Sequence, residues 1–542
     1  MARRIAIALL RNDLRVWDNP VLYAARDSPG TTHFLPLFVF DERQIELSGV
    51  KGFSSSAPEA RTRICGFWRT GRHRACFLAQ SVFDVKRRLQ SLGSDLNVYF
   101  GRAENIVPSL VRHLESKGDT VQGVWLQREV ASEERAVERN LARALKDTKT
   151  QLHLDHSART LVHESDLPFN MPSQLPDVFT AFRKRVEGLN DKMVRPVLDD
   201  PSKGKWPDFP KVDWSDGPFE LSKDVDEKEL VEQLLKPLIE RPVPGDLDTS
   251  SVFYEYKESA FPLKGGETAA RERLEHYVSG ANAPAVTYKD TRNGMVGADY
   301  STKFSPYLTF GCLSARDIVA HCDALEDRLR EEDKLDAAAR RNIYWIKFEL
   351  LWRDYMFFVN SKYGNDIFKL QGLLGSVAPG DANARSDWTS WEDRNGKLQA
   401  WFEGRTGVPF IDACMQFFES FLLDYDPSSN YGNWAYVAGV GNDPRENRKF
   451  NVIKQAKDYD PEAEYVVRWV PEVAGPELDG FQRHVPWRRT RVGSGFILVE
   501  AMVGKVKGVE AVAGVAEGEE VEEEAVGEVG VEGEARASHI MI

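Results

Sequence analysis

The sequence has little cysteine and no long apolar run. Five cysteines occur in 542 residues, odd in number and scattered, and none has the spacing of a zinc site. This pattern argues against a disulfide framework and is typical of a reducing compartment. No apolar run reaches the length of a membrane span. The first one, residues 5–10, predicts a buried strand rather than a signal peptide because an aspartate follows closely.

Nucleotide-binding motifs are also missing from the first part of the chain, which has neither a G-x-G-x-x-G nor a Walker pattern. The net charge of −13 does not exclude nucleic acid as a partner. Ten glutamates and one arginine lie in residues 510–542, so this stretch carries −9 and leaves −4 for the other residues. A body so close to neutral is compatible with a basic patch.

Short apolar runs alternate with amphipathic segments in the first third of the chain. Strands are predicted at residues 5–10, 33–40, 96–100 and 123–126, and helices at 77–90, 103–116 and 132–145, the last capped by Ser132. This alternation predicts an α/β domain over residues 1–190, with a doubly wound parallel sheet covered on both faces. In such folds ligands bind at the carboxyl ends of the strands.

The pattern changes twice after this domain. Residues 191–265 are rich in proline and charge and have little periodicity, which predicts an interdomain linker. Residues 266–490 have helical periodicity and predict an all-α domain. Residues 491–542 are rich in valine, glycine and glutamate. They predict a disordered tail, because their apolar residues are too small and sparse to offset the cost of ordering.

One stretch of the helical region, residues 341–360 (RNIYWIKFELLWRDYMFFVN), is apolar on nearly every side and predicts a helix that is buried all round. Glu349, Trp352 and Arg353 share one of its faces. These three residues form either an intrahelical Glu–Arg pair beside a core tryptophan or one wall of a ligand cavity. Spacing alone favours the pair.

A second candidate is the turn-rich stretch 288–306. The hydroxyl groups of Ser301, Thr302 and Ser305, together with Lys303 and the backbone amides before a helix, suit a phosphate group. A helix cap at Ser301 or Ser305 is the alternative, and spacing alone favours it.

A third candidate is the stretch 423–441, in which Asp424 and Asp426 lie two residues apart. Three interpretations stay open: acid–base chemistry, hydrogen bonds to a heterocycle, and capping of the next helix. Because no histidine lies nearby, we predict no metal site here.

Taken together, these stretches resemble the cryptochrome/photolyase family, and within it the DASH-type cryptochromes. The resemblance covers residues 1–487 and is carried by RNDLRVWDNP, KDTRNGMVGADYSTKFSPYLTFGCLS, FELLWRDYMFFVNSKYGNDIF, TGVPFIDACM and LLDYDPSSNYGNWAYVAGVGNDPRENRKFNVIKQAKDYDP, in the family's order. It implies an α/β antenna-binding domain and a helical domain that holds a U-shaped FAD.

The implied activity is blue-light-driven splitting of cyclobutane pyrimidine dimers in single-stranded DNA, by a monomer with 5,10-methenyltetrahydrofolate as its antenna. The alternatives are a photoreceptor without repair activity and a truncated form that holds no flavin.

The resemblance also implies roles for individual residues. The diphosphate side of FAD would be held by Tyr288, Ser301, Thr302, Lys303, Phe304, Ser305 and Arg353, and its ring and ribityl side by Asp424, Asp426 and Asn430. DNA would contact Glu349, Trp352, Tyr436 and Arg445. The ends of a tryptophan chain that reduces the flavin would be Trp434 and Trp391, and Glu129 would hold the folate. For each tryptophan alone, core packing is the alternative.

The chain departs from the family after Met415, where IDACM passes directly into QFFESFLLDYD. Family members carry an S-N-R-G-R-Q motif and a D-W-R segment there. The gap is roughly 35 residues, which is room for two or three average helices. The resemblance implies that the missing stretch supplies an arginine partner for Asp424, an asparagine near the cofactor and the middle tryptophan of the chain. Its loss would remove one wall of the FAD pocket.

Overall fold

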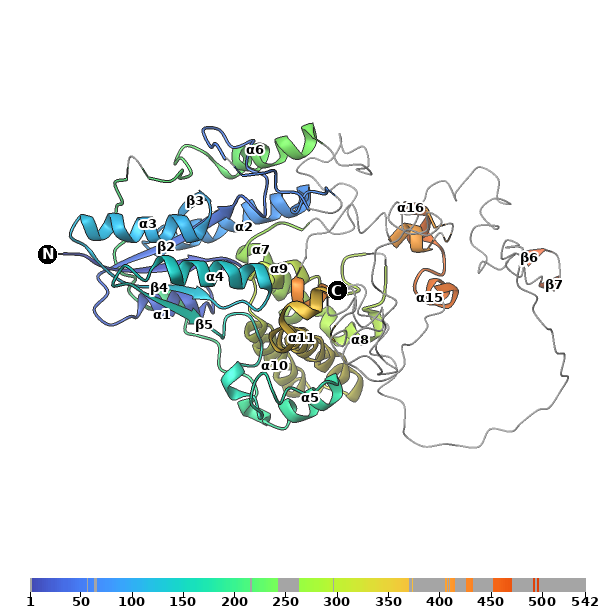
Figure 1. Cartoon of the computed structure of the whole chain (residues 1–542). Helices are drawn as coiled ribbons and strands as arrows, with labels where there is room; N and C mark the ends of the chain where they lie inside the picture. Colours follow the sequence, from blue (N-terminus) through green and yellow to red (C-terminus); the bar gives the residue numbers. More distant parts are fainter. Residues whose placement is uncertain are drawn as a thin grey trace, which may run out of the picture. The chain divides into compact units, whose positions relative to one another are not determined.

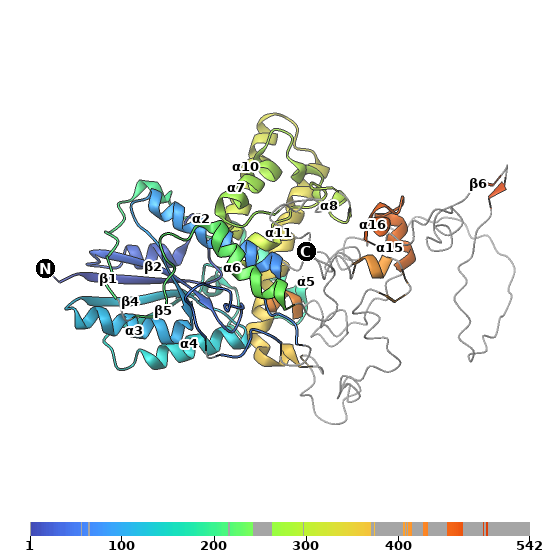
Figure 2. The same ribbon diagram turned by 90° about the horizontal axis from the view of Figure 1, so that it is seen from above.

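The computed structural model describes residues 2–55, 57–62, 66–214, 217–241, 263–295, 297–369, 373, 405–406, 408, 410–414, 426–431, 452–469, 491–492 and 495–496. The chain divides into two compact units. The larger unit comprises Met1–Arg292, Gly297–Glu392 and Glu419–Asn447, and the smaller one Asn293–Val296, Asp393–Phe418 and Arg448–Ile542. Figures 1 and 2 show that the larger unit contains the parallel sheet and the long helix α11.

The sheet has five parallel strands in the order β3-β2-β1-β4-β5 (Figure 1). These strands are β1 (Arg4–Leu10), β2 (His33–Asp41), β3 (Asn97–Gly101), β4 (Thr120–Gln127) and β5 (Gln151–Asp155). The order reverses direction at β1, so the predicted doubly wound α/β fold is confirmed. Strand β5 was not predicted, because this edge strand is partly exposed and has no continuous apolar run.

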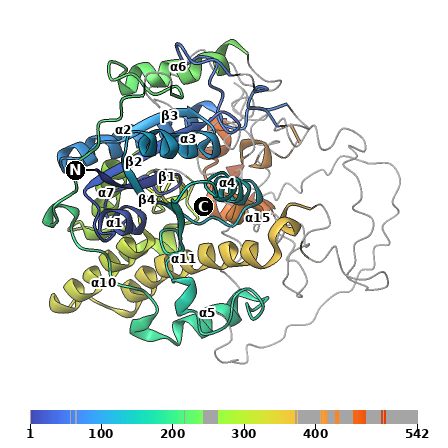
Figure 3. The ribbon, with the colours of Figure 1, turned by 60° about the vertical axis from the view of Figure 1, so that its left-hand side comes forward.

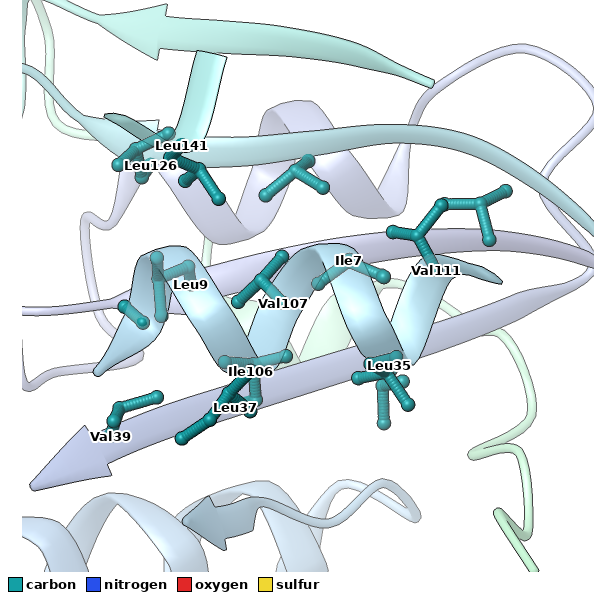
Figure 4. Packing of buried hydrophobic residues seen from close by; sticks show 14 of the residues in the cluster. Ile7, Leu9, Leu35, Leu37, Val39, Ile106, Val107, Val111, Leu126 and Leu141 are labelled. Atoms are coloured by element: carbon teal, nitrogen blue, oxygen red, sulfur yellow. The ribbon is translucent and has the colours of Figure 1, made fainter. Parts of the chain in front are cut away.

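Helices cover the sheet on both faces: α1 (Pro20–Arg26), α2 (Arg72–Ser91), α3 (Ala103–Ser116) and α4 (Ser132–Ala144). Alternate residues of a strand point to opposite faces. Ile7 and Leu9 of β1 therefore pack with Val107 of α3 and Leu141 of α4 in one apolar cluster (Figure 4). The predicted cap at Ser132 is wrong, because Ala131 occupies the N-cap position and Ser132 is already helical.

The remaining helices of the larger unit include one in the predicted linker. They are α5 (Phe179–Glu187), α6 (Glu227–Glu240), α7 (Glu267–Leu274), α8 (Tyr288–Thr291), α9 (Ser305–Thr309), α10 (Ala315–Glu331) and α11 (Ala337–Tyr363). Helix α6 packs against α2 and buries leucines such as Leu230 and Leu234. The predicted linker, residues 191–265, therefore contains a helix with one buried face. Helix α5 falls within residues 1–190 but packs against α11.

Helix α11 is the long buried helix expected from residues 341–360. Asp336 caps its N-terminus by accepting a hydrogen bond from Ala339 N at 2.7 Å. Most of its residues from Asn342 to Asn360 are buried, against α5, α8, α10 and the turn Pro284–Thr287. The helix therefore positions side chains toward several neighbours at once.

A polar joint connects the segment after β1 to the segment before α10. Leu14 N donates to Phe310 O at 3.0 Å, and Arg15 Nη1 donates to Gly311 O at 2.9 Å. Gly311 has a φ of 67°, and a Cβ atom there would lie 2.0 Å from Asn12 O. Only glycine therefore fits this close approach of the two backbones.

The smaller unit contains α15 (Val452–Tyr459), α16 (Glu464–Trp469) and the short strands β6 (Arg491–Val492) and β7 (Gly495–Phe496). Its apolar cluster includes Phe410, Ala456 and Val466. Asp460 caps α16, because its carboxylate accepts hydrogen bonds from Tyr465 N and Val466 N. Within the ranges described here, no helix combines the length and apolarity needed to cross a membrane.

Candidate functional site

Glu349 is held by an arginine from another helix. Its carboxylate pairs with the guanidinium of Arg292, at the end of α8, and the two side chains are only 9% and 6% exposed. The intrahelical pair of Glu349 with Arg353 is therefore wrong. Burial raises the pKa of Glu349 to about 7, although the charge of Arg292 acts in the opposite direction.

Tyr288 completes this buried cluster between α8 and α11. Its ring packs edge-on against Tyr277, with 6.3 Å between the ring centroids. Burial, and then the charge of Glu349, raises the pKa of the Tyr288 hydroxyl well above its usual value. Tyr288, Arg292 and Glu349 thus lie together in a buried site that holds one carboxyl group, one guanidinium and one phenol.

Arg353 and Asp354 of α11 bind the backbone of the segment after β5. Arg353 donates to Arg159 O at 2.6 Å and to Leu308 O at 3.2 Å. Asp354 is fully buried and accepts hydrogen bonds from Leu161 N at 3.0 Å and from Val162 N. Burial lowers the pKa of Arg353 to about 10. Arg353, predicted to contact a phosphate group of FAD, therefore already binds two carbonyl oxygens of the protein.

Asp426 and Asn430 bond to each other. Asp426 N donates to Asn430 Oδ1 at 3.0 Å, and Asp426 Oδ1 accepts from Ser429 N at 2.8 Å. Of the three interpretations of this carboxylate, the structure shows the helix cap, at the start of the helical residues 427–431. Asn360 of α11 donates to Ser428 Oγ at 3.0 Å, which fixes this short helix to α11.

Arg159 joins two of the predicted ligands. Its guanidinium pairs with Asp426 Oδ2 and lies 3.5 Å from Glu129 Oε1. Glu129 follows β4 at the carboxyl edge of the sheet and also accepts from Asn12 at 3.1 Å and from Gln127. Sequence reasoning missed Arg159, because no motif marks it and Asp426 is 267 residues away. Asp426, predicted to contact the flavin, and Glu129, predicted to contact the antenna, thus both lie against the buried guanidinium of Arg159.

The loop before α9 carries the residues predicted to bind phosphate. Arg273 donates to the backbone oxygens of Ala298, Ser301 and Thr302, at 2.9–3.0 Å. The backbone carbonyls are therefore engaged, while the side chains of Ser301, Thr302, Lys303 and Ser305 stay partly exposed and Phe304 is buried. The capping alternative is wrong, since Phe304 occupies the N-cap position of α9 and no side chain caps it.

Trp352 is packed against another aromatic ring. Phe179 of α5 stacks on it, with ring centroids 3.7 Å apart and planes inclined by 16°. One face of the Trp352 ring is therefore covered by α5, and its contact with DNA stays a prediction. Asp424, Tyr436, Trp434, Trp391 and Arg445 lie outside the described residues. Within the ranges that are described, no group of three or more histidine, cysteine, aspartate or glutamate side chains is arranged to hold a metal ion.

Replacing Glu349 with glutamine (E349Q) is expected to reduce the pH dependence of stability. A carboxyl group with a raised pKa in the folded protein binds more protons when folded than when unfolded. Its contribution to the free energy of unfolding therefore falls as the pH rises from the unfolded pKa through about 7, by about 3 kcal/mol in total. Urea unfolding at about pH 5 and about pH 8 measures this change.

The matched control for this experiment is E232Q, on the exposed face of α6. It removes a carboxylate whose ion pair with Lys228 is exposed and weak. If E349Q and the wild-type protein lose stability in parallel between the two pH values, Glu349 is ionised in the folded protein throughout.

Two family models match the chain. The model described as DNA photolyase matches residues 6–200, and the one described as the FAD binding domain of DNA photolyase matches residues 345–417 and 415–500. The Cryptochrome DASH of Danio rerio is 38% identical, over 90% of this chain and 86% of that protein. The Cryptochrome DASH of Gloeobacter violaceus is 36% identical, over 90% of this chain and 89% of that protein.

Solved structures match the same fold. A cryptochrome from Synechocystis sp. has a TM-score of 0.70 at 32% identity, and the match covers 90% of this chain and 92% of that chain. An archaeal photolyase from Sulfolobus tokodaii, at 20% identity, has a TM-score of 0.58 over 89% of this chain and 92% of that chain.

The matches also bear on the stretch predicted to be missing after Met415. The FAD-domain model matches in two pieces that meet at residues 415–417. The alignment with the Danio rerio protein has 519 positions, whereas 90% of 542 residues is about 488, so about 31 aligned positions have no counterpart in this chain. The two-piece match favours an internal gap at this point, and the alignment favours unmatched positions of about that total number.

Proposed function

Because this chain belongs to the DASH-type cryptochromes of the cryptochrome/photolyase family, we propose that it repairs cyclobutane pyrimidine dimers in single-stranded DNA under blue light. It carries the family's FAD-binding domain. The observation that carries the proposal is Glu349, a buried acid on α11 that Arg292 holds in place. In this family a carboxyl group on this helix would meet the bases of the dimer.

Glu349 can both donate and accept a hydrogen bond near neutral pH, because burial raises its pKa to about 7. The ion pair with Arg292 fixes the orientation of the carboxyl group before a substrate arrives. A dimer in a single strand is extruded without the cost of unpairing a duplex. Tyr436 and Arg445 are the further residues that we assign to DNA.

For the cofactor, Ser301, Thr302, Lys303 and Ser305 would bind the FAD phosphates through side chains that are partly exposed. Phe304 and Tyr288 are buried beside this loop and would pack against the cofactor. Bound FAD supplies light-driven electron transfer. The ring side would be held by Asp424, Asp426 and Asn430. Arg353, which donates to Arg159 O at 2.6 Å, would lie on the diphosphate side.

Three further assignments complete the proposal. Trp391 and Trp434 would carry electrons to the cofactor. Glu129, at the carboxyl edge of the sheet, would bind a methenyltetrahydrofolate antenna in the α/β domain, where ligands of such folds bind. Trp352, stacked on Phe179, would support the wall of the dimer cavity from behind.

Blue light is expected to restore a thymine dimer placed in an oligo(dT) strand, whereas the same mixture in the dark is expected to stay unrepaired. In E349Q the repair rate should fall at least tenfold. A hydrogen bond to a charged group contributes about 1.4 kcal/mol or more, and losing that energy slows the reaction by about this factor. Chromatography of the oligonucleotide against illumination time measures the rate.

The matched control variant is K347Q, which changes a residue of the same helix. Lys347 is half-buried and pairs with the exposed Asp323 of α10, so K347Q should leave the repair rate unchanged. A yellow protein that binds the oligonucleotide but repairs nothing in the light would reject repair in favour of photoreception. Equal rates in E349Q and wild type would reject the role of Glu349.

A further inference from the structure

The outer face of α4 carries a row of cations. Arg135, Arg139 and Arg143 are exposed and spaced four residues apart, and Lys146 and Lys149 continue the row beyond the end of the helix. We call these five residues the basic stripe. Figure 3 shows α4 beside α3 in the larger unit, and the two helices pack against each other. At 1.5 Å per residue, successive arginines lie about 6 Å apart along the axis.

Acidic residues of α4 point away from the basic stripe. Glu138 is buried and pairs with Arg11 at 2.7 Å, beside the apolar core. Glu133, in the first turn, pairs with Arg69. Glu134 is half-buried, and burial raises the pKa of its carboxyl group. Asp147 is the one acidic residue between 139 and 149. The arc of the helix that holds the three arginines therefore has no carboxylate.

Several cations on other helices of the larger unit have acidic partners. Lys228 and Lys236 of α6 lie 4.0 and 3.9 Å from the glutamates four residues later. Arg330 of α10 pairs with Asp327, and Lys347 of α11 pairs with Asp323. By contrast, no residue of the basic stripe forms an ion pair within the part of the chain that is described here.

This arrangement is unfavourable in the free protein, because like charges four residues apart on a helix destabilise it. A carboxylate between the arginines would relieve this repulsion. The chain is acidic overall, yet it places no carboxylate on this arc of the helix. Arg143 Nη1 is also fixed by Asn140 Oδ1 at 3.1 Å, which orients its guanidinium at the surface. An anionic ligand would give these charges the partner that the protein does not provide.

We propose that the basic stripe binds the phosphate backbone of a nucleic acid strand, at a place separate from the residues assigned to FAD and to the dimer. Arginine forks match phosphate oxygens with two parallel hydrogen bonds. A membrane surface fits less well, because the apolar face of α4, with Leu141, is buried in the core and none is left for lipid. The contact would be independent of sequence and of lesions, since no exposed group of the stripe is placed to read bases.

The triple variant R135Q/R139Q/R143Q tests this proposal in the full chain. Its affinity for an undamaged, labelled oligo(dT) is measured in the dark by fluorescence anisotropy over a series of salt concentrations. Loss of three phosphate contacts should reduce the slope of log K against log salt by about 2 for a single strand. Near 0.15 M salt, the same slope corresponds to a loss of affinity on the order of 50-fold.

A matched control is K223Q/K228Q/K236Q, which removes three exposed cations from α6 and the residues before it. It changes the net charge by the same amount and should leave the slope unchanged. Equal losses in the two variants would mean that only total charge matters, and this would overturn the proposal.

Two other results would also reject the proposal. One is an affinity that rises in the triple variant, which would mean that the stripe opposes binding. The other is a loss of binding to anionic lipid vesicles but not to oligo(dT). Should the triple variant fail to fold, K146Q/K149Q provides the same test outside the helix, with an expected fall in slope of about 1.4.

Discussion

Inserting the stretch of about 35 residues that follows the equivalent of Met415 in a DASH relative is expected to raise the FAD content of the purified protein severalfold. The two pieces of the FAD-domain match meet at residues 415–417, which sets the insertion point. Flavin absorbance relative to protein absorbance measures the content, and titration of the apoprotein with FAD gives the affinity.

The physical reason is the loss of a partner for a buried charge. By resemblance, the missing stretch provides an arginine for Asp424, and a buried carboxylate without a counter-ion costs about 3–5 kcal/mol. An energy of that size corresponds to a change of more than a hundredfold in a dissociation constant. Arg159 does not replace the missing arginine, because it already pairs with Asp426 Oδ2. The other oxygen of Asp426 accepts a hydrogen bond from Ser429 N.

A glycine–serine insertion of equal length is the control, because it lengthens the chain without supplying the arginine. It should leave the FAD content where it is. If the family stretch has no greater effect than this control, the gap does not limit flavin binding. This result is distinct from a failure of repair, since a protein that is fully loaded with FAD can still be tested for repair.

Much of the fold could be predicted from the sequence, because its signals are local. The run Ile5–Leu10 is apolar without alternation, as expected of a strand that is covered on both faces, and β1 is the central strand. Residues 341–360 are apolar on nearly every side, and most residues of the helix from Asn342 to Asn360 are buried. Helix α6 was missed, since proline and charge around it hide its row of leucines.

The partners of the candidate site residues could not be predicted in the same way. Spacing offers Arg353 as the partner of Glu349, but Arg292, 57 residues earlier in the chain, takes that place. Helical spacing shows which residues share a face and not what packs against that face. Asp426 is similar, because its cap is a local feature whereas its bond to Arg159 depends on how distant segments meet.

Replacing Asp18 with asparagine (D18N) is expected to lower the free energy of unfolding by about 3 kcal/mol or more. Asp18 is 0% exposed and lies in the joint between the segment after β1 and the start of α10. Its carboxylate accepts hydrogen bonds from Ser314 Oγ, from Leu198 N at 3.0 Å and from Arg316 Nη2 at 2.7 Å. Asparagine is the suitable replacement, because Asp18 has a φ of 50° and asparagine tolerates this left-handed conformation.

The expected loss of stability in D18N comes from Arg15 and Arg316, which stay buried without the charge of Asp18. Arg316 is buried, and Arg15 beside it is 2% exposed and donates to the backbone oxygens of Asp18, Gly311 and Ala158. Without the charge of Asp18, both guanidinium groups lose a counter-ion in a site that water does not reach. Urea unfolding followed by tryptophan fluorescence measures the change.

The control for D18N is D27N, which neutralises an aspartate that is paired with Arg26 at the surface and should cost less than about 1 kcal/mol. The double variant D18N/R316M removes the stranded charge as well, and it should regain part of the stability that D18N loses. If D18N is as stable as D27N, the remaining neighbours of Arg15 and Arg316 suffice to solvate both charges. If D18N/R316M is less stable than D18N, the guanidinium of Arg316 stabilises the joint through its packing rather than through its charge.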